Sequence, residues 1–281
     1  MNRIFNKKSA TGLKIKHAFL ILLACFIIGL ISTILTGKIL EDTDFRTLIN
    51  YMLSLGIPVF VAIKIYEKYA DKYSLNISTK YLKLIPILMP LPILLQFGLT
   101  SHLVHLIPMP EYIKQMFYEM GNGYSWENFL LPLILAPVLE EILCRGIILK
   151  GLLNNCNPRK AIFVSSIIFG LLHFNPWQFI GAFGIGLING WIFWKTKNIL
   201  LAIAMHFANN FFFMLFGIYF GTAYLVDKPM RAVFGSPLNQ TLAIVVSLLL
   251  LLAILFYLKQ RFETSKTKHS FGNRDAKSIQ K

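Results

Sequence analysis

Long apolar runs recur along almost the whole chain, and they constrain the fold more than any other feature. The hydrocarbon core of a bilayer is about 30 Å thick, so a helix that rises about 1.5 Å per residue needs about 20 apolar residues to cross it. The runs of about this length lie at residues 18–36, 47–66, 82–107, 129–150, 159–174, 176–195, 199–220 and 238–258. We therefore expect an all-α, polytopic membrane protein with about eight transmembrane helices.

The composition also favours a membrane protein over a soluble one. Hydrophobic residues make up 56% of the 281 residues, and charged residues only 15%. The net charge of +15 could indicate nucleic-acid binding, but the basic residues lie in short segments between apolar runs, where they act as topology signals. We expect membrane lipid as a partner and no nucleic acid. The three cysteines show no paired spacing and indicate neither a disulfide framework nor a cysteine metal site.

Lysine and arginine are distributed unevenly over alternate loops. If the N-terminus is cytoplasmic, the inner segments carry 22 of the 28 basic residues and the outer loops 5, while Arg145 lies within a span. The positive-inside rule then places both termini in the cytoplasm. The predicted organisation is a basic N-terminus at 1–17, an eight-helix membrane domain at 18–258 and a basic cytoplasmic tail at 259–281.

Three ionisable residues lie inside the fourth apolar run, in the stretch "APVLEEILCRG". Each charge at the bilayer centre costs about 2.5–3.5 kcal/mol on insertion scales, so Glu140, Glu141 and Arg145 need compensation. Glu141 and Arg145 are spaced i,i+4, which allows an ion pair on one helix face. Glu140 points about 100° away and has no such partner, which suits a group that accepts and returns a proton. The alternative is a structural salt bridge beside one uncharged glutamate.

Two later runs also carry polar residues. A lone histidine in an apolar helix usually serves packing, but here the depths agree. Counted from the cytoplasmic span ends at about 1.5 Å per residue, the polar side chains of spans four, five and seven fall within a layer roughly 10 Å thick. The residues in this layer are Glu140, His173, His206 and Asn210. We expect them to meet at an intramembrane polar cavity, with a catalytic core at about 129–220.

Hydrolysis is the chemistry that these residue types suit. A carboxylate can act as general base on a water that a histidine holds, while a second histidine and an amide donate to a developing oxyanion. A metal is the competing interpretation, because two histidines and a glutamate form many zinc sites. Its ligands would be Glu140, His173 and His206, although the chain has no His-Glu-x-x-His helix. A divalent metal such as zinc and a metal-independent mechanism are both left open.

Three motifs follow one another on successive predicted helices: Glu140-Glu141-x-x-x-Arg145, Phe169-x-x-x-His173 and His206-x-x-x-Asn210. This ordered set resembles the CAAX protease and bacteriocin-processing (CPBP, or Abi) family, whose best-known members are type II CAAX prenyl endopeptidases. The resemblance implies an eight-helix core and water activation by Glu140 and His173. It also implies oxyanion stabilisation by His206 and Asn210, with Glu141 and Arg145 in supporting roles.

The expected function is therefore intramembrane endopeptidase activity on a membrane-associated peptide or protein. The Lys- and Asn-rich usage looks bacterial, so we expect the bacterial cell membrane and a role in peptide maturation or bacteriocin immunity rather than prenylated CAAX substrates. The alternative is a non-proteolytic membrane scaffold or immunity protein that binds a peptide. A transporter would also contain intramembrane carboxylates, but broken helices in matching halves are not evident. The sequence gives no indication of oligomeric state.

Overall fold

A computed structural model describes residues 12–41, 44–70, 72–75, 77–122, 126–228 and 230–278. Every regular element in these residues is a helix, which confirms the all-α prediction. Most of the predicted N-terminal segment, residues 1–11, lies outside the described residues, as do residues 279–281.

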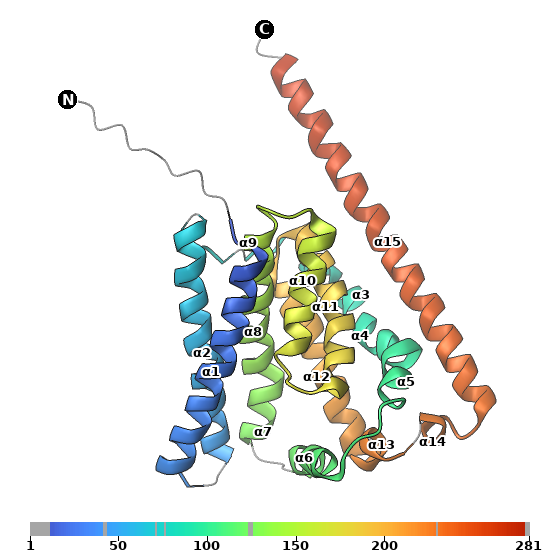
Figure 1. Cartoon of the computed structure of the whole chain (residues 1–281). Helices are drawn as coiled ribbons and strands as arrows, with labels where there is room; N and C mark the ends of the chain where they lie inside the picture. Colours follow the sequence, from blue (N-terminus) through green and yellow to red (C-terminus); the bar gives the residue numbers. More distant parts are fainter. Residues whose placement is uncertain are drawn as a thin grey trace.

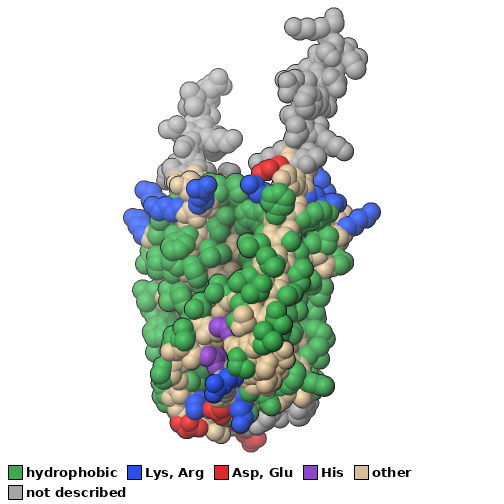
Figure 2. Space-filling model, turned by 90° about the vertical axis from the view of Figure 1, so that its right-hand side faces the viewer, with side chains coloured by type: hydrophobic (Ala, Val, Ile, Leu, Met, Phe, Trp, Pro, Cys, Tyr) green, Lys and Arg blue, Asp and Glu red, His purple; other side chains and the backbone are tan. Residues whose placement is uncertain are grey.

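Among the described residues, five helical stretches are long and apolar enough to cross a membrane. They are α1 (Ile15–Ile39), most of α2 (Asp44–Tyr69), the stretch Leu82–Val104, α12 (Ile199–Phe220) and the part Pro237–Glu263 of α15 (Pro237–Ser278). Figure 2 shows the result at the surface, where hydrophobic side chains form a broad belt and charged side chains gather at the two ends. The chain is therefore an integral membrane protein with several apolar helices.

The stretch Leu82–Val104 is divided into short helices, as its prolines predict. Proline lacks a backbone N–H and removes a helical hydrogen bond wherever it stands inside a helix. The elements in order are η1 (Leu82–Leu84), α3 (Ile85–Leu88), α4 (Pro90–Leu95), the π-helix η2 (Gln96–Thr100) and α5 (Ser101–Val104).

The segment that contains the glutamate pair is helical but alternates between α and π geometry. Its elements in order are α7 (Trp126–Leu130), η3 (Leu131–Leu135), α8 (Ala136–Glu141), η4 (Ile142–Leu149) and α9 (Lys150–Leu152). Both η3 and η4 are π-helices. Insertions of π geometry into α-helices are rare and occur frequently at functional sites, because they change the direction of side chains and free backbone groups.

Helices α10 (Pro158–Leu171) and α11 (Pro176–Thr196) pack closely against each other. Each begins with an asparagine cap followed by proline, a sequence signal for a helix start. Glycine allows the close approach: a Cβ at Gly186 would lie 3.1 Å from the Cβ of Ser166, and one at Gly190 would lie 3.0 Å from Ile162. α10 ends at Leu171, three residues before the end of the predicted span 159–174, so His173 lies in the turn after the helix and not inside it.

The helices form a bundle that has α1 and α2 on one side and α15 on the other (Figure 1). Helices α8, α10, α11 and α12 lie between them, and α6 (Glu111–Asn122) lies across one end of the bundle. The start of α1 and the end of α15 both lie toward the opposite end. α15 continues through most of the segment predicted as a C-terminal tail.

α6 is held in place by polar contacts with the chain that follows α12. The Lys114 ammonium lies 2.9 Å from the Asp227 carboxylate, and the Tyr118 hydroxyl donates a hydrogen bond to the same carboxylate. The Tyr118 hydrogen bond, with that from Lys114, lowers the pKa of Asp227. These exposed contacts, together with the short helices α13 (Ala223–Val226) and α14 (Met230–Phe234), close this end of the bundle.

Candidate active site

Glu141 and Arg145 form the predicted ion pair, and both side chains are fully buried. Arg145 Nη1 donates to Glu141 Oε1 at 3.0 Å, and Nη2 donates to the Gly186 carbonyl oxygen at 3.2 Å. The guanidinium also lies over the Phe169 ring, 4.3 Å from its centroid. One arginine thus joins η4 to α10 and α11, which explains why a buried charge at this position is tolerated.

Glu141 is the centre of a larger buried network. Its Oε1 also accepts hydrogen bonds from Asn189 Nδ2 at 3.1 Å and from His206 Nδ1 at 3.2 Å. The network therefore connects α8, α11 and α12. Because a carboxylate can only accept, we assign the proton of His206 to Nδ1. Nε2 of that ring then accepts when the ring is neutral and donates only when the ring carries both protons.

Glu140 lies in a different environment from its neighbour. Its Oε1 accepts a hydrogen bond from the Tyr51 hydroxyl on α2 at 2.7 Å. Its Oε2 is buried and has no hydrogen-bond partner within the described part of the chain. The nearest ionisable nitrogen is His206 Nε2, 4.0 Å away. This separation is too long for a direct hydrogen bond but suits a bridging water, which needs about 2.8 Å to each side.

A small cavity of about 110 Å³ adjoins Glu140. Tyr51 and Ser54 of α2 line it together with Cys25 and Gly29 of α1. A water occupies about 30 Å³ in the liquid, so the volume is enough for a few waters but not for a peptide. His173, His206 and Asn210 are not among the lining residues. This space is therefore not the shared polar cavity predicted from the sequence, because Glu140 alone of the four predicted residues lines it.

His173 lies in the tight turn between α10 and α11. Its Nδ1 contacts the Phe169 carbonyl oxygen at 3.0 Å, which assigns the proton to Nδ1 and leaves Nε2 as an acceptor. The next residue, Phe174, has a φ of 53° and lines the cavity beside Glu140. Such a conformation is strained for a bulky side chain, and strain of this kind often marks functional sites.

Phe169 connects the two predicted histidines. Its ring meets the His173 ring edge-on with centroids 5.5 Å apart, and it meets the His206 ring in the same way at 5.4 Å. No hydrogen bond joins His173 to Glu140, His206 or Asn210 in the described structure. The histidines are therefore neighbours across an aromatic ring rather than partners in one polar network.

The Asn210 amide is engaged by the backbone. Its Nδ2 donates to the Pro132 carbonyl oxygen at 2.8 Å, and its Oδ1 accepts from Asn209 Nδ2 at 3.0 Å. Pro132 lies in η3, where the Ala136 N–H bonds to the Leu131 carbonyl, five residues back. The next donor in this π pattern would be residue 137, which is a proline without an N–H. The Pro132 carbonyl is thus left open for Asn210.

The three predicted metal ligands are not gathered at one point. Among the described residues, no three His, Cys, Asp or Glu side chains are grouped closely enough to hold a metal ion. The predicted ligand set of Glu140, His173 and His206 therefore does not form a three-ligand centre in this structure. The second carboxylate near His206, that of Glu141, is already bound to Arg145 and Asn189.

Two residues that contribute to the polar site, Tyr51 and Gln96, were not identified from the sequence. Tyr51 lies 89 residues before Glu140 and is one of 11 tyrosines, so nothing in its local pattern indicates the contact. Gln96, a buried polar residue in η2, contacts Asn209 at 3.4 Å and extends the chain of amides from Asn210. The available signal for Gln96 was its polar side chain inside the third predicted span, which prolines interrupt.

The fold and the buried glutamate pair define an all-α integral membrane protein with a polar site between its helices. Residues 122–212 match the family model described as type II CAAX prenyl endopeptidase Rce1-like, and they include all six predicted site residues. The resemblance inferred from the three motifs is therefore confirmed for this segment, which is similar to the CAAX-type intramembrane proteases.

Two curated bacterial proteins are similar to the chain. YdiL of Bacillus subtilis (strain 168), named as a candidate membrane peptidase, is 32% identical over 113 residues, covering 35% of this chain and 46% of YdiL. The membrane-embedded CAAX protease MroQ of Staphylococcus aureus (strain USA300) is 34% identical over 90 residues, covering 30% of this chain and 36% of MroQ. The matched part thus spans less than half of either relative. No solved structure matches the chain at a significant level.

Proposed function

We propose that the chain is an intramembrane endopeptidase that hydrolyses a peptide bond of a membrane-associated peptide or protein. One observation carries this proposal: the buried, unpartnered Oε2 of Glu140 faces His206 Nε2 at 4.0 Å, while Tyr51 fixes the other carboxylate oxygen. A water in this gap would contact a base on one side and an imidazole on the other.

The proposed reaction proceeds without a metal step. Glu140 Oε2 takes a proton from the water, and the hydroxide oxygen attacks the carbonyl carbon of the scissile bond. The negative charge that forms on the carbonyl oxygen accepts a hydrogen bond from the doubly protonated His206. The C–N bond then breaks, and the proton held by Glu140 moves to the leaving nitrogen. The peptide is released as an acid and an amine, and Glu140 returns to its starting state.

The roles of His173 and Asn210 are extensions of this proposal. Because His173 Nδ1 is bound to the Phe169 carbonyl, its Nε2 is free to accept a hydrogen bond from the water and help to orient it. Asn210 Nδ2 carries two N–H groups; one donates to the Pro132 carbonyl, and the second would donate to the oxyanion. Glu141 and Arg145 hold the orientation of His206 and do not touch the water.

The proposal includes about eight spans, both termini in the cytoplasm of a bacterial cell, and a role in peptide maturation or bacteriocin immunity. Beyond the five long apolar helices, the remaining spans would be the Trp126–Leu152 segment, α10 and α11. Reporter fusions after residues 75, 155 and 270 should report cytoplasm, and fusions after 42, 118 and 230 the outside. An outside signal at 155 would invert the segment that carries Glu140 and contradict this topology.

Comparison of peptide termini tests the function without a known substrate. Membranes from a host that expresses the wild-type chain should contain at least one protein or peptide terminus that is missing with Glu140→Gln at equal abundance. A scaffold is the second candidate, favoured by the small size of the cavity. Identical termini in both strains, with the cellular phenotype restored by Glu140→Gln, would establish the scaffold instead.

A further inference from the structure

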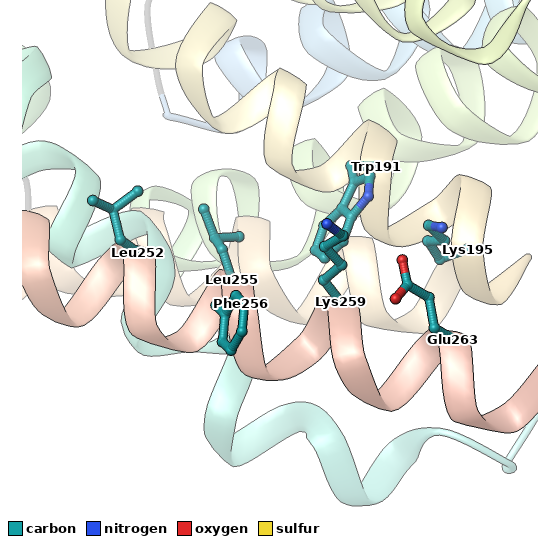
Figure 3. Close-up of a pocket in the computed structure, with 7 residues that line it drawn as sticks. All are labelled: Trp191, Lys195, Leu252, Leu255, Phe256, Lys259 and Glu263. Carbon is teal, nitrogen blue, oxygen red and sulfur yellow. The ribbon is translucent and has the colours of Figure 1, made fainter.

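A second concave feature lies on the outside of the bundle, away from the glutamate pair. It is a groove of about 520 Å³ between the C-terminal half of α11 and the outer helix α15 (Figure 3). None of the predicted site residues lines it. α15 is the least buried of the five candidate spans, at 17% of its apolar window, so the groove faces the surroundings of the bundle.

The groove has an apolar part and a charged part in a fixed order. Along α15 the lining residues are first Leu252, Leu255 and Phe256, and then Lys259 and Glu263. Leu252, Phe256, Lys259 and Glu263 recur every three or four residues and Leu255 adjoins Phe256, which places them on one face of the helix, over about 16 Å at 1.5 Å per residue. A ligand that follows this face therefore meets hydrocarbon along one part and charge at the other.

α11 repeats the same order beside it. Trp191 is followed one turn later by Lys195, which lies in the last turn of the helix. The Lys195 ammonium lies over the Trp194 ring, 4.4 Å from its centroid, and this contact restricts its position. The two lysines thus flank the same end of the groove on two different helices (Figure 3).

The charged end of the groove is anchored by aromatic packing. The Trp191 ring meets the buried Phe262 ring with centroids 5.6 Å apart, and the Tyr81 ring meets the same ring with centroids 6.3 Å apart. The apolar part is open, since the side chains of Leu252 and Phe256 are both 61% exposed. An apolar chain can therefore enter the apolar part from the side, while the aromatic packing keeps α11 and α15 at a fixed distance at the charged end.

We propose that this groove is a binding site for one anionic phospholipid, with an acyl chain along the apolar face of α15 and the phosphate against the ammonium groups of Lys195 and Lys259. The two lysines and Glu263 give the lining a net charge of +1, which complements a headgroup with a single net negative charge. Phosphatidylglycerol has this charge, whereas phosphatidylethanolamine is neutral overall. The proposal is independent of the endopeptidase function.

Native mass spectrometry of the full chain in detergent tests the headgroup preference. The probes are phosphatidylglycerol and phosphatidylethanolamine with identical acyl chains, offered together. We expect retention of phosphatidylglycerol over phosphatidylethanolamine. The double variant Lys195→Gln, Lys259→Gln should weaken phosphatidylglycerol binding about 25-fold, since each lysine near an anionic surface contributes roughly a factor of five.

A matched control removes two lysines from another helix. The variant Lys64→Gln, Lys68→Gln loses the same charge near the end of α2, outside the groove, and should change binding less than about twofold. An equal loss in both double variants would show bulk attraction and overturn the site. Inorganic phosphate should not displace the lipid. Three outcomes would contradict the proposal: displacement of the lipid by phosphate, equal binding of the two lipids, or a dimer of the chain that carries no lipid.

Discussion

Glu140 and Glu141 are neighbours in sequence, yet they differ in how many hydrogen bonds each carboxylate accepts and in whether a cavity adjoins it. On the side of α11 and α12, one oxygen of Glu141 accepts bonds from Arg145, Asn189 and His206, all buried. On the side of α1 and α2, Glu140 has a single hydrogen bond, from Tyr51, and adjoins a cavity. Each glutamate keeps one buried oxygen without a hydrogen-bond partner in the described structure, but only Glu140 adjoins a cavity, so its oxygen is the one that water can reach.

This division predicts opposite effects of the same chemical change. Glu140→Gln keeps the shape and still accepts a hydrogen bond from Tyr51, but it cannot take a proton from water. Cleavage should fall by about 10²- to 10⁴-fold, the usual contribution of a general base, while stability changes by less than about 1 kcal/mol. Cleavage assays and membrane abundance, measured on the same preparation, check both parts. Cleavage that persists at the wild-type rate would remove Glu140 from the mechanism.

Glu141→Gln should instead destabilise the protein. The substitution leaves the Arg145 guanidinium buried without its counter-charge, which typically costs about 3–5 kcal/mol. Melting in detergent and abundance in the membrane measure the loss. The double variant Glu141→Leu, Arg145→Met removes both charges and serves as the control, since it should be more stable than Glu141→Gln. Equal stability of Glu141→Gln and Glu140→Gln would contradict the contrast between the two regions.

Tyr51→Phe tests whether α2 takes part in the site. A hydrogen bond to a charged group contributes about 1.5–3 kcal/mol, so loss of the hydroxyl should lower kcat about tenfold or more. KM should stay unchanged, because Tyr51 orients Glu140 and is not proposed to bind substrate. Tyr66→Phe is a matched control about 22 Å further along the same helix, at 1.5 Å per residue. A similar effect of both variants would indicate a general weakening of α2.

Cys144→Ala should have the smallest effect on cleavage. Cys144 is fully buried one turn after Glu140, and its backbone carbonyl, not its thiol, accepts a hydrogen bond from Ser165 at 2.9 Å. Removal of the sulfur leaves a small void, with a cost of about 1 kcal/mol. Cleavage measured per folded molecule should match the wild type. A loss as large as that of Glu140→Gln would favour a thiol nucleophile.

The sequence predicted what depends on local spacing. The Glu141–Arg145 pair follows from an i,i+4 separation, and the break between α10 and α11 follows from the cap and proline of "NPW". What depends on packing between distant helices was not predictable: the Tyr51 contact, and π geometry around Arg145, which changes the direction of side chains. His173 was placed in a helix because its spacing from Phe169 is helical, but the chain turns before reaching it. The sequence also gave no sign that the Asn210 amide is bound to a carbonyl.

The proline at position 137 has a consequence for how this site can vary among related chains. Because Pro137 supplies no N–H, the Pro132 carbonyl on η3 is satisfied by an amide from α12, 78 residues away in sequence. Any other residue at 137 would bring a competing donor to that carbonyl, and the Asn210 side chain would lose its need to stay there. The tolerated residue at 210 therefore depends on the residue at 137, and substitutions at the two positions combine non-additively. Positions 137 and 210, which no motif connects, should therefore vary together.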